Sequence, residues 1–362
     1  MRLMRTAAVT ATTIAALTLA ACSSAGDPAT TASSTPVPSA PADDAAGTPS
    51  GTVTVVTHDS FYVDEALLAS FEAETGLTVE FVAPGDAGTL VNQLVLTKDA
   101  PLGDVVYGID NTFATRATEA AVLAPYTSAA QAASDAEQYA IPGAEDLLTP
   151  IDFSDVCLNY DLAAFPDGAP TLDDLTDPAH AGQVSVTNPA TSSPGLAFML
   201  ATIGAKGDGW LDWWGAMRDN GLRVTASWSD TYYTDFSAPN YGGDYPIVLS
   251  YASSPPFEVI DGAPTTAAML DTCFRQVEYA GVLEGAANPT AAQAVVDWML
   301  SDDFQAALPE SMYVFPVSSS VEVPADWAQY APLADAPATL DPAEIDAHRD
   351  EWIDAWTAAV LD

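Results

Sequence analysis

The sequence predicts an α/β protein with two lobes and a ligand cleft between them. Near-continuous apolar strands alternate with helical segments, a pattern typical of parallel sheets covered by helices. The alternation occurs in two series, and an extended stretch from Leu148 to Tyr160 lies between them as a candidate crossing. The length of 362 residues suits about two domains. Two lobes joined by extended crossings form a hinge-closing architecture that captures solutes.

The first series contains three strand–helix units. The expected strands cover Thr52–Thr57, Leu77–Val82 and Asp104–Ile109, and the expected helices cover Val63–Ala73, Leu90–Leu96 and Ala114–Ala121. Ligands of doubly wound sheets bind beyond the carboxyl ends of the strands. The polar residues at those ends, which are therefore candidate ligand contacts, are His58, Asp59, Asp86 and Asp110.

The second series follows the crossing. Its expected strands are Val184–Thr187, Leu222–Ala226 and Pro246–Ser250, with helices at Leu196–Ile203, around Trp210, Trp213 and Trp214, and at Ala291–Leu300, Phe304–Leu308 and Pro342–Val360. Two further extended segments, Phe274–Val282 and Tyr313–Val317, return between the lobes. We therefore assign residues 52–150 and 281–312 to lobe 1, and residues 151–280 and 313–362 to lobe 2. The tryptophan helix is interpreted as core packing.

The N-terminus has the pattern of an export signal and an anchor. Residues 1–21 combine two arginines with a short apolar run, as in a secretory signal. The run ends in Leu19-Ala20-Ala21-Cys22, which is typical of a bacterial lipobox in which Cys22 is lipidated; the alternative is an ordinary signal cleaved at an Ala-x-Ala-like site. Residues 22–51 are rich in Ser, Thr, Ala and Pro and predict a disordered tether. We expect an extracytoplasmic protein held to the cytoplasmic membrane by lipid alone, without a transmembrane helix.

The charge balance excludes one class of partner. The chain has 9 Lys+Arg against 50 Asp+Glu, a formal net charge of −41. Nucleic-acid binding needs clusters of Lys and Arg, and the chain has only two lysines, Lys98 and Lys206. We therefore expect no nucleic-acid partner.

Two cysteines remain after Cys22. Cys157 and Cys273 would lie in an oxidising compartment, where a disulfide is expected, with two buried free thiols as the alternative. Neither cysteine has a neighbouring histidine in the sequence, so a metal site is not expected.

Two groups of residues could bind an organic ligand. Ser192-Ser193-Pro194-Gly195 opens a helix, with Ser193 as the expected cap, and its N-terminus could take a phosphate or carboxylate; the alternative is a plain capped helix. Aromatic residues expected in loops after strands could stack on a flat ring or face a cation, and they are Trp228, Tyr232, Tyr233, Tyr251, Phe257 and Tyr313. Asp59, Asp86 and Asp110 could compensate the charge of that cation.

The chain has no G-x-S-x-G, H-E-x-x-H or P-loop motif, so we expect no enzyme.

These blocks together resemble a known family. The stretches TVVTHDSF, DVVYGIDN, NPATSSPG, ASWSDTYY, IVLSYASSPPF and ALPESMYVFPV occur in the order found in thiamine-binding proteins of bacterial ABC importers, over roughly residues 52–360. The resemblance implies a type II periplasmic-binding-protein fold with thiamine or a phosphate ester between the lobes. It implies ligand contacts from Asp86, Ser192, Trp228, Tyr251, Phe257 and Tyr313. Phe257 stands where the family usually has Tyr, Tyr313 where it has Trp, and His58 where it has Tyr.

The resemblance also implies the partners. We expect a monomer that needs no cofactor, binds a thiamine-type molecule and delivers it to the permease of an ABC importer. One alternative is a protein of the same fold that binds another cation, a polyamine or ferric iron. The other is a thiaminase-like enzyme, for which Cys157 and Cys273 would be the candidate nucleophiles.

Overall fold

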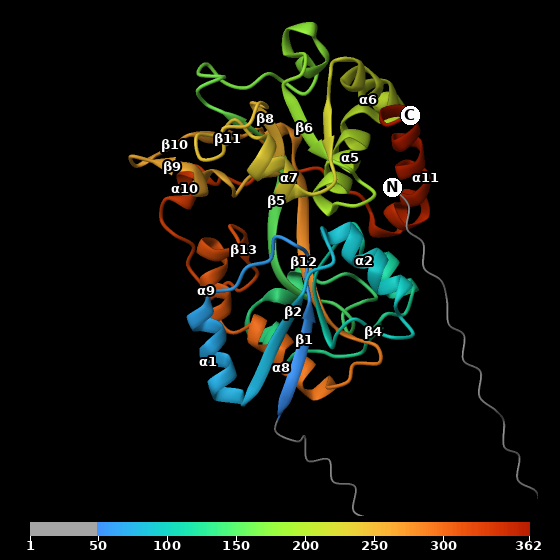
Figure 1. Ribbon diagram of the computed structural model, residues 1–362, viewed down its shortest axis with the longest axis vertical. Helices are drawn as coiled ribbons and strands as arrows, with labels where there is room; N and C mark the ends of the chain where they lie inside the picture. Colours follow the sequence, from blue (N-terminus) through green and yellow to red (C-terminus); the bar gives the residue numbers. More distant parts are fainter. Residues whose placement is uncertain (1–48) are drawn as a thin grey trace, which may run out of the picture. The chain divides into compact units, whose positions relative to one another are not determined.

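The computed structural model describes residues 49–362, which belong to one compact unit (Figure 1). The predicted signal, the lipidated Cys22 and nearly all of the predicted tether lie outside the described residues. The first strand, β1, begins at Gly51, one residue before the expected start. Among the described residues, no helix is both long and apolar enough to cross a membrane.

Two groups of parallel strands lie in one mixed sheet. The first group contains β1 (Gly51–Val56), β2 (Leu77–Val82) and β3 (Val105–Asp110), and the second contains β6 (Val184–Thr187), β7 (Arg223–Thr225) and β8 (Ile247–Tyr251). The main strand order is β2-β1-β3-β12-β5-β8-β6-β7. The expected parallel pairing is present within each group, whereas the two long strands at the centre run antiparallel to their neighbours.

Those two long strands are the connections between the groups. β5 (Thr149–Asp161) pairs with β8, β12 (Phe274–Leu283) pairs with β3, and the two pair with each other, side by side at the centre of Figure 1. All but one residue of β5 and all but one of β12 are buried. The predicted crossings are confirmed as strands, whereas the exact lobe boundaries stay a prediction.

The helices form close to the expected positions, but α1, α2 and α5 begin two to three residues away from the expected start, directly after a capping residue. Asp64, Asp86 and Ser192 each accept a hydrogen bond from a backbone N–H of the first turn, which satisfies a donor that the helix leaves unpaired. The helices are α1 (Glu65–Thr75), α2 (Ala87–Leu96), α3 (Ala114–Glu119), α4 (Ala130–Ala133), α5 (Ser193–Lys206), α6 (Trp210–Asp219), α7 (Trp228–Asp230), α8 (Pro289–Met299), α9 (Asp302–Ser311), α10 (Trp327–Tyr330) and α11 (Pro342–Val360). The short remaining strands are β4 (Leu123–Ala124), β9 (Val259–Ile260), β10 (Ala263–Pro264), β11 (Thr266–Ala268) and β13 (Phe315–Pro316).

The tryptophans of α6 pack in the core, as predicted. Trp210, Trp213 and Trp214 are all buried. Trp214 lies edge-on to Trp356 of α11 with ring centroids 5.4 Å apart, and its indole N–H donates to Thr202 Oγ1 of α5 at 2.8 Å. The aromatic helix therefore joins α5 and α11 and takes no part in a cavity.

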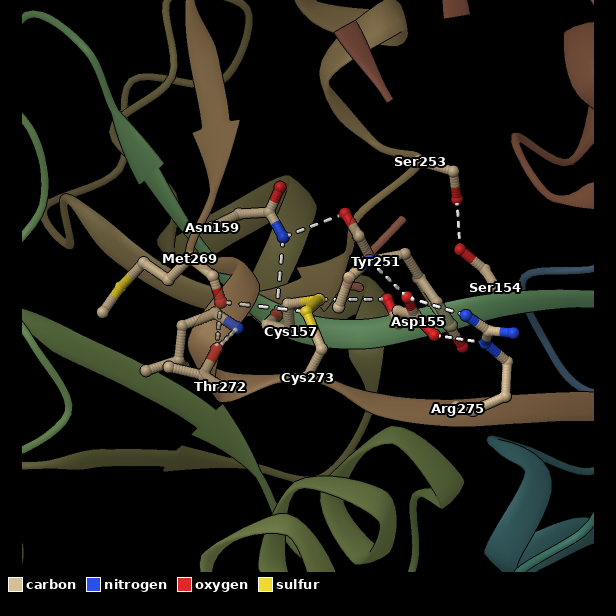
Figure 2. Close-up of a disulfide and its surroundings, with 12 residues drawn as sticks. Ser154, Asp155, Cys157, Asn159, Tyr251, Ser253, Met269, Thr272, Cys273 and Arg275 are labelled. Carbon is tan, nitrogen blue, oxygen red and sulfur yellow. Dashed lines mark hydrogen bonds and ion pairs between the residues drawn. A yellow bond between two sulfur atoms is a disulfide. The ribbon is translucent and has the colours of Figure 1, made fainter. Parts of the chain in front are cut away.

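A disulfide joins the two central strands. Cys157 of β5 is bonded to Cys273, which directly precedes β12, so the prediction of a disulfide is confirmed (Figure 2). Close by, Arg275 of β12 forms an ion pair with the fully buried Asp155 of β5. Asp155 also accepts from the backbone N–H of Ala334 at 2.8 Å. A covalent and an ionic link therefore hold the same end of the strand pair.

Removing the disulfide should lower stability. In a full-length chain carrying Cys22→Ser, the double variant Cys157→Ser/Cys273→Ser should lose about 2–5 kcal/mol of unfolding free energy, because the unfolded chain regains the freedom of a long loop. Denaturant unfolding followed by circular dichroism measures this loss. The Cys22→Ser parent is the control, and equal midpoints for parent and variant would contradict a stabilising link.

Candidate functional site

A cavity of about 350 Å³ lies where the two strand groups meet. Its walls come from the loop after β1, from the turns around α7 and after β8, from β12, and from the segment that ends α9. The lining residues are His58, Ser60, Tyr62, Trp228, Tyr232, Tyr233, Tyr251, Ser254, Phe257, Glu278, Glu310, Ser311, Met312, Tyr313 and Val314. The volume is within the range of small-molecule sites.

The predicted aromatic residues gather in this cavity. Trp228 stacks on Tyr232 with ring centroids 4.9 Å apart, and Phe257 meets Tyr313 edge-on at 4.8 Å. Tyr251 lies at the last position of β8. The expectation that these residues occupy loops is wrong for five of the six. Tyr251 belongs to β8, and the others lie on short helical turns: Trp228, Tyr232, Tyr233 and Phe257. A single turn fixes a ring more firmly than an open loop would, because its backbone is hydrogen-bonded.

Several of these rings are exposed inside the cavity. Tyr62, Tyr233 and Phe257 are 54%, 46% and 41% exposed, although all three are large and aromatic. Clustered exposed rings mark a surface that a partner or ligand covers. Tyr313 adds a local constraint, because its φ of 55° is in the left-handed region that non-glycine residues seldom adopt. Such backbone strain is typical of functional positions.

The charges in the cavity are negative. Glu278 and Glu310 line it, and no Lys or Arg is among the described lining residues. His58 adds no lasting positive charge, because burial lowers the pKa of its imidazole more than the nearby Asp86 and Asp59 raise it. The cavity therefore favours a cationic, ring-containing molecule, which can interact with aromatic faces and carboxylates together.

Glu278 and Glu310 are the charged lining residues that the sequence analysis did not single out. Glu278 interrupts the apolar run of β12 and is 7% exposed, whereas Glu310 is exposed near the end of α9. The position of Glu278 within an otherwise apolar strand could have indicated its role. One glutamate is difficult to single out, however, in a chain with 50 acidic residues.

The predicted acid Asp86 supports the cavity from behind. It caps α2 through a hydrogen bond from Ala87 N at 2.6 Å, and its other oxygen accepts from Trp228 N at 2.8 Å. Burial is the main reason that its pKa is raised to about 6. Asp86 is therefore outside the lining residues and holds the backbone of Trp228 in place.

Ser192, Ser193 and Asp110 are also buried behind the cavity. Ser192, rather than the expected Ser193, caps α5, where its hydroxyl accepts from Gly195 N at 3.4 Å. The Gln276 amide of β12 donates to Asp110 Oδ2 at 2.7 Å and to Ser193 Oγ at 2.8 Å. Burial is the main cause that raises the pKa of Asp110 to about 6. These three residues and the exposed Asp59 are not among the lining residues, and their contact with a ligand stays a prediction.

Residues beside the cavity join the two strand groups. Thr89 of α2 donates its backbone N–H to Thr191 O at 3.0 Å, next to the contact between Asp86 and Trp228. The close approach depends on Gly88, since a Cβ there would lie 2.7 Å from the Thr191 carbonyl carbon. The position therefore requires glycine for space.

The described residues hold no cluster of His, Cys, Asp and Glu suited to a metal ion. The arrangement that remains is a ring-walled, negatively charged cavity between two groups of parallel strands. A fold of this kind with such a cavity defines a solute-binding protein. The chain belongs to the bacterial extracellular solute-binding protein family, whose profile matches residues 100–338.

Individual relatives agree with that family. The thiamine-binding periplasmic protein of Escherichia coli K12 is 28% identical over 319 residues, covering 85% of this chain and 93% of that protein. The thiamine-binding periplasmic protein of Brucella suis is 28% identical over 321 residues, covering 85% and 92%. A solved periplasmic thiamin binding protein superimposes with a TM-score of 0.76 at 28% identity, covering 85% of this chain and 96% of that one.

More distant solved structures share the fold alone. Iron-bound HitA from Pseudomonas aeruginosa has a TM-score of 0.66 at 22% identity, covering 85% of this chain and 99% of that one. AfuA from Actinobacillus pleuropneumoniae, with fructose-6-phosphate bound, has a TM-score of 0.69 at 17% identity, covering 86% and 99%. These neighbours are periplasmic binding proteins, which confirms the predicted type II fold.

A side chain at Gly88 should weaken the contact between α2 and the Thr191 backbone and lower the stability of the protein. Gly88→Ala should lower the free energy of unfolding by about 1–3 kcal/mol, because its Cβ would overlap the Thr191 carbonyl. The matched control is Gly215→Ala in α6, where a Cβ meets nothing within 4 Å and alanine should stabilise the helix slightly. Thermal unfolding of both variants makes the comparison. Equal midpoints for the two variants would show that the close approach is not needed.

Proposed function

We propose that the protein captures thiamine outside the cytoplasmic membrane, as a monomer without a cofactor, and delivers it to the permease of an ABC importer. The observation that carries this proposal is the cavity, in which aromatic faces and two carboxylates meet without a lysine or arginine among the described lining residues. The relatives that match across most of the chain bear the name thiamine-binding periplasmic protein.

The chemistry of thiamine suits these walls. Its flat pyrimidine can stack on the rings of Trp228 and Tyr251, and its cationic thiazolium can face aromatic π-systems and carboxylates. Phe257 and Tyr313 keep the stacking surface, although they differ from the residues usual in the family. Their different hydrogen-bonding groups would alter how the ring edges are recognised.

The same charges favour free thiamine over its phosphate esters. A phosphate would add negative charge near Glu278 and Glu310, and no cation among the described lining residues would offset it. The predicted phosphate site at Ser192 and Ser193 is buried, with exposures of 0% and 1%. We therefore expect the uncharged hydroxyethyl tail to be preferred.

The thiaminase-like alternative has little support. It needs a free thiol, and Cys157 and Cys273 are bonded to each other. The chain also belongs to a family of solute-binding proteins. A test for thiamine breakdown during binding measurements would detect such an activity directly.

Calorimetric titration of the purified full chain tests the ligand. Thiamine should bind with a dissociation constant of about 1 µM or less, and thiamine monophosphate at least about tenfold more weakly. Spermidine and ferric citrate are the competing candidates in the same assay. No heat with thiamine would overturn the proposal, and tighter binding of the monophosphate would favour an anion site near Ser192.

Removing a ring from the wall should weaken binding selectively. Phe257→Ala should raise the dissociation constant for thiamine by roughly tenfold, because an aromatic contact in a cavity contributes about 1 kcal/mol or more. The matched control is Ile260→Ala, since Ile260 is 40% exposed three positions further on and is not a lining residue. Equal losses in both variants would indicate a general disturbance of this segment.

We also propose that a lipid on Cys22 holds the protein at the membrane. The support is the lipobox-like sequence Leu19-Ala20-Ala21-Cys22 that follows a short apolar run. In a bacterial host, the full chain should incorporate a labelled fatty acid and sediment with membranes, whereas Cys22→Ser should do neither. Ser23→Ala is the control, and labelling of the Cys22→Ser variant would contradict the anchor.

A further inference from the structure

Two carboxylates and a phenol form a buried cluster at the base of the cavity. Glu278 of β12 lies opposite Asp152 of β5 in the strand pairing. The Tyr107 hydroxyl of β3 lies 2.6 Å from Asp152 Oδ2 and 3.2 Å from Glu278 Oε2. Their exposures are 0% for Tyr107, 1% for Asp152 and 7% for Glu278, and only Glu278 reaches the cavity lining.

The number of protons in this cluster follows from its geometry. A phenol hydroxyl has one proton and can donate it to one carboxylate. The second carboxyl oxygen within hydrogen-bond distance of the same phenol therefore needs a proton of its own to donate back to it. Two facing carboxylates in a buried site also repel each other unless one is neutral.

Two buried atoms at the cluster have no hydrogen-bond partner among the described residues. They are His58 Nε2, 3.6 Å from Glu278 Oε1, and Asp152 Oδ1. His58 lines the cavity and is 6% exposed, and its other ring nitrogen is hydrogen-bonded to Ser60 Oγ at 2.9 Å. A buried polar atom without a partner is costly, so these atoms point to a ligand group or water at this spot.

We propose that Glu278 and Asp152 share one proton in the ligand-free protein and release it when a cation binds beside Glu278. The O–H bond of one carboxylic acid breaks, its proton passes to the buffer, and the pair goes from one negative charge to two while the cation supplies one positive charge. The inference deepens the proposed function and rests on it, because thiamine is the cation used as the probe.

The surroundings allow such a release. The groups that face Glu278 from the neighbouring strands and the loop after β1 are Asp110, Tyr107, Asp152, Tyr251 and His58, none of which is a fixed cation. The nearest arginine on the strand, Arg275, is paired with Asp155. Burial is the main cause that raises the pKa of Glu278 to about 7, and burial together with the charge of Glu278 raises the pKa of Asp152 well above its ordinary value.

The sign of the pH dependence follows from proton competition. Burial raises the pKa of both carboxyl groups, so the pair still holds its shared proton at neutral pH. The cation must displace that proton, and binding therefore weakens as the pH falls. The dissociation constant for thiamine should be at least about tenfold higher near pH 6 than near pH 8. Titration near pH 6.5 in two buffers of different ionisation enthalpy should show roughly one proton released per thiamine bound.

Four variants of the full chain identify the group that releases the proton. Glu278→Gln should abolish both the proton release and the pH slope. Asp152→Asn removes the facing carboxylate but leaves Glu278 buried, so it should reduce both effects without altering a lining residue. Glu310→Gln is the matched control, since it removes an exposed carboxylate from the same cavity. It should raise the dissociation constant through the lost charge but keep both the proton release and the pH slope. His58→Gln should also keep both, because the pKa of His58 lies below its ordinary value.

The outcomes distinguish this inference from the proposed function. Thiamine binding without proton release, or with a pH slope that survives Glu278→Gln and Asp152→Asn, would overturn the shared proton and leave the function intact. No thiamine binding at all would overturn the function itself. The neutral thiophene analogue of thiamine should bind more weakly and release no proton, and release with this analogue would contradict displacement by charge.

Discussion

Strands β5 and β12 pair antiparallel over most of their length, and each parallel group of the sheet is hydrogen-bonded to one of them. The cavity depends on this pairing, because it fixes how far the turns after β1 and β8 lie from each other. The disulfide and the ion pair between Asp155 and Arg275 strengthen the end of the pair next to β8. Asp152 and Glu278 lie further along the same two strands, away from the disulfide.

Several buried acidic residues lie in the central strands and in β3, and their surroundings differ. Asp155 is neutralised by Arg275, and Asp110, at the end of β3, receives hydrogen bonds from Gln276, Thr112 and Phe113 N. Asp152 and Glu278 have only the Tyr107 hydroxyl between them. Burial without a full set of partners is costly in a structural position, and it is useful where a ligand completes the set.

Much of the fold could be predicted from the sequence because its signals are local. The strand Leu77–Val82 and the helix Pro342–Val360 have the expected bounds, since apolar runs and caps are read within a few residues. The antiparallel course of β5 and β12 could not be predicted in the same way, because pairing between segments so distant in sequence leaves no local pattern. The expected parallel pairing holds within each strand group and ends at these two strands.

The same distinction between local and long-range signals applies to the residues of the site. The rings of Trp228, Tyr251, Phe257 and Tyr313 were predicted from strand ends and from family resemblance, and the structure brings all four to one cavity. Asp86 and Ser192 were predicted as ligand contacts, but they cap helices behind it. Short polar residues before a helix look alike in sequence whether they bind a ligand or a backbone N–H. Glu278 was missed because its importance depends on Asp152 and Tyr107, which lie on other strands.

Trp228 has one more consequence. The chain has 8 tryptophans, and Trp228 is the one among the described cavity residues, stacked on Tyr232 and bonded through its indole N–H to Ser250 Oγ at 3.0 Å. Its emission should therefore respond to a molecule that enters beside it. The protein carries its own optical reporter of occupancy, and loading and unloading can be followed in real time without attaching a dye.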